Sequence, residues 1–141
     1  MNESTWQECC DANSAITITP NLAKARSLID TAQGRLDYLN NNPVNEKNAN
    51  YIFEGYYSSV LELLHALLTK KGYKVVNHIC VGFYIRDVLH DEELFRLFDD
   101  CRYKRNSLTY YGRKMDFETA KDAIESVKKI IQKLNKLTQN D

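Results

Sequence analysis

The sequence predicts an all-α protein, an antiparallel up-and-down bundle of four long helices and one short helix. Only 5 glycines and 2 prolines interrupt the 141 residues, so long helices can form without breaks. Apolar residues recur at intervals of three and four positions, which is the spacing of one helix face. The sequence shows neither a convincing strand pattern nor a repeat of about 20–50 residues. A hydrophobic content of 43% is typical of a globular domain.

The first two predicted helices are bounded by cap and breaker residues. The first is expected to begin at Pro20, with Thr19 as its N-cap, and to end at the breaker formed by residues 40–43. The second is expected to run from residue 45 or 46 to residue 71, where Gly72 supplies the stop. Their apolar faces are formed by Leu22, Ala25, Ile29, Ala32, Leu36 and Leu39, and by Ile52, Phe53, Tyr56, Val60, Leu63, Leu64, Leu67 and Leu68.

Three further helices are predicted in the C-terminal half. Asn77 is expected to cap a short helix over residues 78–89, and a fourth helix follows from residue 91 to Gly112. Asp116 is expected to cap a last helix whose apolar positions are Phe117, Ala120, Ile124, Val127, Ile131 and Leu134. The predicted bundle is one domain spanning residues 19–138.

The first 18 residues lie outside this predicted domain, and we expect a flexible arm or a short docking segment there. They lack the basic region and the continuous apolar region of a signal peptide. No segment approaches the roughly 20 apolar residues that a membrane span needs. We therefore expect a cytoplasmic protein with no membrane contact.

The four cysteines are expected to be reduced. Cys80 and Cys101 fall in apolar helical stretches and are predicted to be buried thiols. The adjacent Cys9 and Cys10 would not form an ordinary disulfide with each other. The spacing of the four fits no zinc site, so neither a metal nor another cofactor is predicted.

Positive charge is concentrated in residues 102–114, RYKRNSLTYYGRK, although the net charge of the chain is zero. This stretch holds five cations, three tyrosines and no acid, whereas residues 85–100 hold six acids and two arginines. Cations beside aromatic rings suit a phosphate or a nucleic acid. Because the whole chain is neutral, any such binding must be local.

Arg105 occupies a position that the helical spacing assigns to the apolar face. A lone guanidinium in an apolar core is costly, so it needs an anion, polar partners or a wet cleft. One interpretation is an ion pair with Glu54 or Glu62 of the second predicted helix. The other is a cleft or a two-fold interface in which Arg105 meets phosphate, flanked by the polar row Arg102, Asn106 and Tyr110.

Three segments carry a resemblance to a known family. They are YYSSVLELLHALLTKKGYK in the second predicted helix, NHICVGFYI, which places a histidine at position 78, and RNSLTYYG. In this order and spacing they resemble the HEPN domain, the family named for higher eukaryotes and prokaryotes nucleotide binding. The likeness covers roughly residues 20–137 and implies the same helical bundle.

In catalytic relatives the HEPN signature is an arginine, four to six residues and a histidine. The resemblance then implies a metal-independent endoribonuclease that acts across a homodimer interface, in some cases beside a minimal nucleotidyltransferase in a toxin–antitoxin or defence system. The arginine maps to Arg105 and the following polar residue to Asn106. Tyr110 stands where the histidine belongs, and the tyrosine that partner enzymes modify in some toxins falls at Gly112.

The missing histidine favours binding over cleavage. Histidine, with an ordinary pKa of about 6.5, trades protons at neutral pH, whereas tyrosine, near about 10, needs strong tuning. Our first prediction is therefore an RNA- or nucleotide-binding module without efficient ribonuclease activity. The alternatives are a ribonuclease with altered catalytic residues, which would use His78 or a tuned Tyr110, and a structural or protein-interaction bundle.

Each predicted site residue has an expected role. Arg105 would contact phosphate, Asn106 would orient it, and Tyr110 would stack or donate a hydrogen bond. Secondary contacts are expected from Arg102, Lys104, Tyr111, Arg113 and His78. Of the other histidines, His65 is expected at the edge of the core and His90 in an exposed turn.

Overall fold

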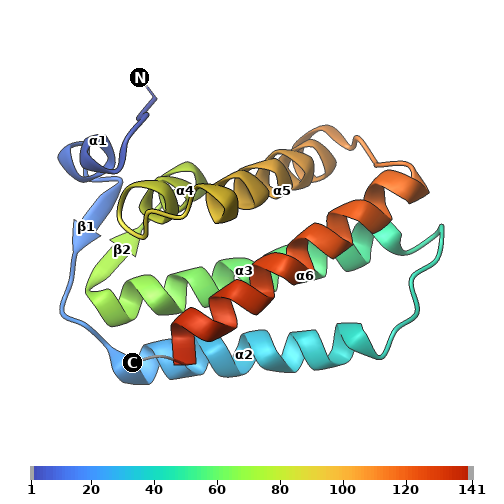
Figure 1. The fold of residues 1–141 in the computed structure, drawn as a ribbon, viewed down its shortest axis with the longest axis horizontal. Helices are drawn as coiled ribbons and strands as arrows, with labels where there is room; N and C mark the ends of the chain where they lie inside the picture. The colour runs from blue at the N-terminus through green and yellow to red at the C-terminus, as the bar shows by residue number, and fades with distance from the viewer. Residues whose placement is uncertain (1, 140–141) are drawn as a thin grey trace.

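The computed structural model describes residues 2–139, which form six helices and one two-stranded sheet (Figure 1). The four long helices are α2 (Leu22–Asn40), α3 (Ala49–Lys71), α5 (Glu92–Tyr111) and α6 (Phe117–Gln139). The shorter elements are α1 (Trp6–Asp11), β1 (Ala15–Thr17), β2 (Tyr73–Val75) and α4 (His78–Asp87). The predicted all-α bundle is confirmed.

Helix α3 is the centre of the bundle. It packs against α2 on one side and against α5 and α6 on the others, and α4 packs on α5 (Figure 1). Phe53, Tyr57 and Leu63 of α3 are fully buried, because this helix is apolar around most of its circumference. Among the described residues, no helix is long and apolar enough to cross a membrane.

Several predicted helix boundaries are confirmed by their caps, but α3 begins at Ala49, three or four residues after its predicted start, and α4 ends at Asp87, two residues before its predicted end. The side chains of Asn77, Asp91 and Asp116 accept hydrogen bonds from the first turns of α4, α5 and α6. Gly72 and Gly112 end α3 and α5 with φ angles of 89° and 62°, a left-handed conformation that suits glycine.

The predicted start of the first helix is wrong by two residues. Asn21, and not Thr19, caps α2, because its Oδ1 accepts a 2.9 Å hydrogen bond from the Lys24 N–H. Thr19 and Pro20 belong to an extended segment that precedes the helix, and the Ile18 N–H donates to the Gly72 carbonyl at 2.8 Å. A tertiary contact thus holds this segment out of the helix.

Of the two alternatives for the first 18 residues, the structure contains the docked segment. Trp6 of α1 is buried, and its ring meets those of Tyr73 and Tyr84 edge-on at 5.3 and 5.1 Å. Strand β1 pairs antiparallel with β2, with Ala15 opposite Val75. The sequence analysis missed both strands, because three residues each are too few to show an alternating pattern.

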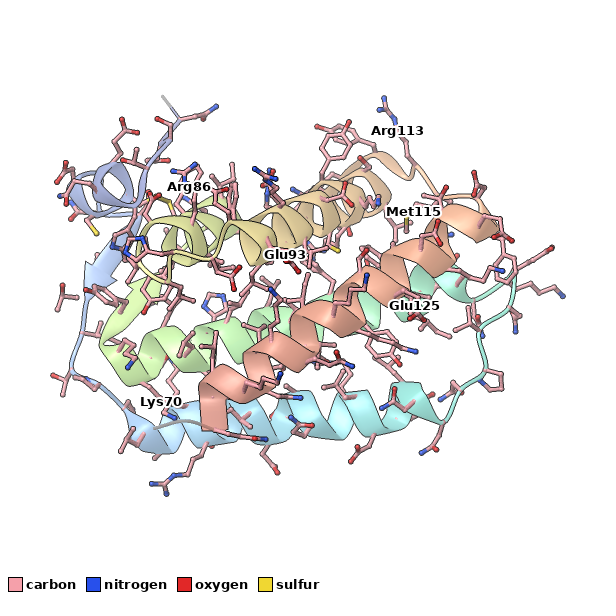
Figure 2. All side chains as sticks on the ribbon, viewed as in Figure 1. Lys70, Arg86, Glu93, Arg113, Met115 and Glu125 are labelled. Carbon is pink, nitrogen blue, oxygen red and sulfur yellow. A yellow bond between two sulfur atoms is a disulfide. The ribbon has the colours of Figure 1, made fainter. Side chains whose placement is uncertain are left out.

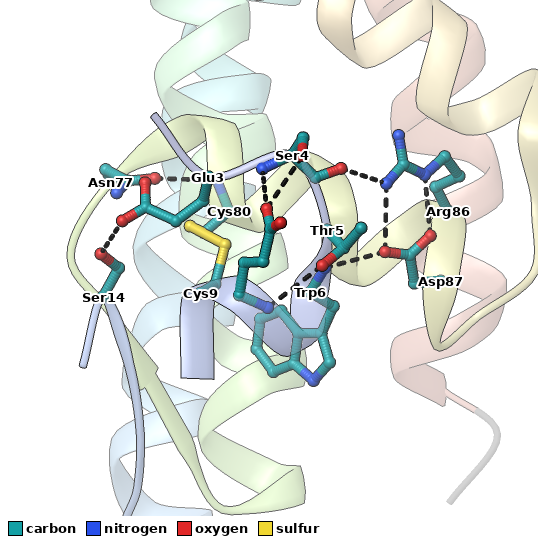
Figure 3. The surroundings of a disulfide bond; sticks show 11 residues. Glu3, Ser4, Thr5, Trp6, Cys9, Ser14, Asn77, Cys80, Arg86 and Asp87 are labelled. Carbon is teal, nitrogen blue, oxygen red and sulfur yellow. Dashed lines mark hydrogen bonds and ion pairs between the residues drawn. A yellow bond between two sulfur atoms is a disulfide. The ribbon is translucent and has the colours of Figure 1, made fainter. Parts of the chain in front are cut away.

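The prediction that Cys80 is a free thiol is wrong. Cys80, in the first turn of α4, forms a disulfide with Cys9 of α1, and both residues are fully buried (Figure 3). The two cysteines are 71 positions apart, so their pairing is not readable from local spacing. The other prediction holds, since Cys101 is a buried free thiol.

Candidate functional site

A cleft lies between the start of α4 and the C-terminal half of α5. Its volume is about 300 Å³. The wall on the α4 side is the run of residues 76–79, and the wall on the α5 side is formed by three residues one helical turn apart, Arg102, Asn106 and Tyr110. The polar row predicted from the sequence therefore faces His78 across one cavity.

Arg105 projects from the same turn of α5 toward the core and has no acidic partner among the described residues. Its Nε atom is buried and makes no hydrogen bond. Its guanidinium carbon lies 5.7 Å from the ring centre of Tyr57 and 5.9 Å from that of Tyr110. The charge is therefore placed between two aromatic rings and not against a carboxylate.

The ion pair that sequence analysis offered for Arg105 is not formed. Glu62 pairs instead with Arg35 of α2, and the Glu54 carboxylate accepts a 3.0 Å hydrogen bond from the Thr109 hydroxyl. A buried donor without a partner costs free energy, and a bound anion would remove that cost. The Nε–H of Arg105, a buried donor without an acceptor, distinguishes this part of α5 from an ordinary solvated basic surface.

His78 lies on the other wall of the cleft, and the pKa of its imidazole is below the ordinary value. Burial lowers the pKa of its imidazole, and the positive charge of Arg105, together with smaller contributions from His65 and Arg102, lowers it further. Its Nδ1 lies 3.4 Å from the hydroxyl of Tyr57, whose own pKa is raised by burial. A neutral imidazole beside two arginines can accept a proton from a bound group.

Arg102 and Lys104 differ in what they offer the cleft. Arg102 donates from Nε to Asp99 at 2.9 Å yet still lines the cavity, and a guanidinium has further donors to present. Lys104 pairs with Asp100 at 2.7 Å and is not among the lining residues. The structure thus brings Arg102 into the site and leaves Lys104 beside it.

Tyr111 and Arg113 lie beyond the cleft, at the exposed end of α5. Their side chains contact each other, with 5.5 Å between the guanidinium carbon and the ring centre. In Figure 2 Arg113 points away from the bundle. Tyr110 is also 68% exposed, but it lines the cavity mouth. Tyr111 and Arg113 can therefore contact only a ligand that extends out of the cleft.

Sequence reasoning named His78 as a contact but missed Tyr57 and the other residues of the α4-side wall, Val76, Asn77 and Ile79. Tyr57 sits in a helical stripe that looks like ordinary core, and only the tertiary fold places it against both Arg105 and His78. His65 instead lines a separate cavity near α2 and β2, and His90 is exposed. The cations and tyrosines of residues 102–114 indicated a candidate site on α5, but the sequence did not show that Tyr57 of α3 contacts that helix.

The described residues contain no group of His, Cys, Asp or Glu side chains that could hold a metal ion. The cleft is lined instead by one guanidinium group, two side-chain amides, a phenol and an imidazole, which together suit an oxyanion attached to an aromatic body. Arg105 is near the Tyr110 ring but is not among the lining residues. Comparison of the chain with family models, with curated proteins and with solved structures gave no match. The site is therefore interpreted from its own geometry.

Proposed function

We propose that the protein is an RNA- or nucleotide-binding module that grips phosphate in the cleft between α4 and α5. The observation that carries the proposal is the buried Nε of Arg105, which has no hydrogen-bond partner. Arg105 does not line the cleft itself, so a phosphate would have to pass the lining residues to reach it. A phosphate oxygen is a suitable acceptor, because guanidinium and phosphate form charge-assisted hydrogen bonds. Arg102 and Asn106 supply further donors on the same wall.

The aromatic residues around the cleft favour a nucleotide over a simple inorganic anion. Tyr110, which lines the cleft, is 68% exposed, and Tyr103 and Tyr111 of the same helix are 65% and 71% exposed. Exposed rings beside cations form stacking platforms for bases. A strand of RNA could thus place a phosphate at Arg105 and a base on Tyr110.

A second candidate function is metal-independent RNA cleavage, which the position of His78 favours. Its neutral imidazole lines the same cleft as Arg102 and Asn106, so it could accept the proton of a ribose 2′-hydroxyl. Cleavage also needs an acid for the leaving oxygen. Tyr110 is the phenol at the cavity mouth, and it stands in place of the histidine that readily trades protons at neutral pH. Binding without efficient cleavage therefore remains our first proposal.

The HEPN resemblance supplies the wider setting of this proposal. It predicts a homodimer in the cytoplasm and a minimal nucleotidyltransferase partner in a toxin–antitoxin or defence system. The purely structural alternative required Arg105 to be neutralised by a buried acid. The engagement of Glu62 with Arg35 and of Glu54 with Thr109 weighs against it.

The test is binding of a fluorescein-labelled single-stranded RNA, followed by fluorescence anisotropy with EDTA present. The key variant is Arg105→Gln, and the matched control is Arg96→Gln, which changes an exposed arginine of the same helix paired with Glu92. We expect Arg105→Gln to weaken binding about tenfold, the effect of losing about 1.4 kcal/mol of charge-assisted contact. Arg96→Gln should bind like the wild type.

Gel analysis of the same samples separates binding from cleavage. Intact RNA with wild-type protein supports the binding module, whereas products that disappear in Arg105→Gln and in His78→Gln would establish the ribonuclease. No binding by the wild type, or equal binding by wild type and Arg105→Gln, would refute the proposed role of the cleft.

A further inference from the structure

The α4-side wall of the cleft is attached to the N-terminal segment at both of its ends. At one end the Val76 N–H donates a 2.9 Å hydrogen bond to the Ser14 carbonyl. At the other end Cys80 is bonded to Cys9. The wall residues 76–79 lie between these two attachments, and Figure 3 shows Asn77 beside Ser14 and the disulfide.

We propose that the Cys9–Cys80 disulfide is a redox clasp that holds the α4 wall of the cleft in its binding geometry, so that reduction weakens phosphate binding. This inference rests on the proposed function of the cleft. His78 is only two residues from Cys80, and the Asn77 side chain caps the helix by accepting a 2.8 Å bond from the Cys80 N–H. Any movement of the first turn of α4, which contains Cys80, therefore moves the capping residue Asn77 and the imidazole of His78 with it.

Helix α1 depends on the disulfide, because it is only six residues long. An isolated helix of this length is unstable in water. Its other attachments are the buried Trp6 ring, the 2.8 Å bond from the Trp6 N–H to Asp87, and the 2.8 Å bond from Arg86 to the Ser4 carbonyl (Figure 3). Once the covalent bond is broken, these contacts can open without unfolding the four long helices.

The chemistry of the clasp is ordinary thiol–disulfide exchange with a cellular dithiol. A thiolate of the reductant attacks one sulfur, a mixed disulfide forms, and the second reductant thiol releases it. In the complete reaction the S–S bond between Cys9 and Cys80 gains two electrons and two protons, and the reductant leaves as a disulfide. Because both cysteines are fully buried, exchange begins only when a local fluctuation exposes one of the two sulfurs, and α1 is released after the bond is broken.

The experiment compares oxidised protein with protein reduced by dithiothreitol, using the labelled RNA and amide hydrogen exchange in parallel. We expect the Kd for RNA to rise about tenfold on reduction, within the usual range of coupling between sites. Amides of residues 76–80 should lose protection, while those of α3 keep theirs. Cys10→Ser is the matched control, since Cys10 is adjacent to Cys9 but has a free thiol. This control variant should respond to reduction like the wild type. Cys9→Ser, which cannot form the disulfide, should match the reduced wild-type protein with and without dithiothreitol.

Several outcomes would overturn the clasp. Equal RNA affinity and equal protection of residues 76–80 in the two redox states would show that the wall does not depend on the bond. Loss of the far-ultraviolet helical signal on reduction would show a global staple and not a local clasp. If the oxidised protein does not bind RNA, the proposed function fails by itself, and the hydrogen exchange of residues 76–80 then decides whether the bond holds the wall.

Discussion

At the scale of one residue, the fold holds the charged side chain of Arg105 without an acidic partner and without an acceptor for its Nε–H. The helical spacing points this residue inward, and the tyrosines at 57 and 110 shield its guanidinium without neutralising it. The sequence alone located this anomaly, because a cation on an apolar stripe is visible in the spacing. It could not decide between an ion pair and a cleft, since that depends on where Glu54 and Glu62 find their partners.

The first prediction at this scale concerns salt. Each phosphate neutralised by the protein releases counterions, so the affinity for single-stranded RNA falls as salt rises. Arg105→Gln should lower the slope of log affinity against log salt concentration by about 0.7, the value for one phosphate contact on a single strand. Anisotropy titrations at several salt concentrations measure this slope. An unchanged slope would show that Arg105 does not meet a phosphate.

The second prediction concerns the pKa of His78, which we expect to lie below the ordinary value of 6.5. Burial is the main cause and the charge of Arg105 the next, so Arg105→Gln should raise the pKa without restoring it fully. Titration of the imidazole resonances by NMR checks this. His65 is an internal control, because burial and Lys24 lower its pKa and Arg105 is not among the causes.

The lowered pKa of His78 also predicts how the free energy of unfolding changes with pH. Below pH 6.5 the unfolded chain binds a proton that folded His78 resists, so the free energy of unfolding should fall as the pH drops from 6.5 toward the folded pKa. His65 contributes in the same direction. Urea unfolding at pH 7.5 and pH 5.5 tests this. The free energy of unfolding should fall less between these two pH values in the His78→Gln, His65→Gln double variant than in the wild type.

At the scale of elements, the loop between α5 and α6 is fixed by one buried side chain. Asn50 of α3 donates from Nδ2 to the Met115 carbonyl at 3.0 Å and accepts from the Met115 N–H at 2.9 Å. This pair of bonds sets the direction in which α6 leaves the end of α5. The backbone of Arg113, earlier in the same loop, is held by a 3.0 Å hydrogen bond from its N–H to the Ser107 carbonyl, and its side chain points away from the bundle (Figure 2).

We predict that Asn50→Ala lowers the free energy of unfolding by about 1–3 kcal/mol, because both backbone groups of Met115 lose their partner. Urea unfolding measures the change. The control is Asn41→Ala, which removes only an exposed bond to the Asp37 carbonyl within one helix end and should cost less than about 0.5 kcal/mol. Equal effects of the two substitutions would contradict the assigned role of Asn50.

Local chemistry explains which elements could be predicted from the sequence. Asn77 and Asp116 could be predicted as caps because a cap acts on its own first turn, and both caps form. Asp91 was expected inside the first turn of its helix, and in the structure it is the N-cap of α5. The start of α2 and the two short strands were missed because contacts between residues 14–21 and residues 69–76 decide them. Such contacts between distant segments leave no periodic signal in the sequence.

At the scale of the whole molecule, the disulfide joins the two ends of a long stretch of chain. In the chain-entropy account, closing a loop of 71 residues stabilises the folded state by about 4 kcal/mol. The all-α fold was predictable from helical spacing, but this connection was not. The disulfide also weighs against the cytoplasmic location that we expected from the sequence, because structural disulfides are rare in a reducing cytosol.

We predict that reduction lowers the free energy of unfolding by about 2–4 kcal/mol while the helical content persists. Urea unfolding of oxidised and reduced protein, followed by circular dichroism, gives both quantities. Cys101→Ser is the control for thiol effects, since Cys101 is buried but unbonded; its oxidised form should still respond to reduction. Identical unfolding of the two redox forms would contradict the assigned bond.

The most direct measurement of the central claim is an NMR titration of the oxidised protein with single-stranded RNA, observing arginine side chains. The account predicts that the Nε–H resonance of Arg105, which has no partner in the free protein, shifts strongly on binding, together with the side-chain amide resonances of Asn106 and the imidazole resonances of His78. The Nε–H resonance of Arg96 should stay in place. Binding that shifts Arg96 and other surface cations but leaves Arg105 unchanged would contradict the account.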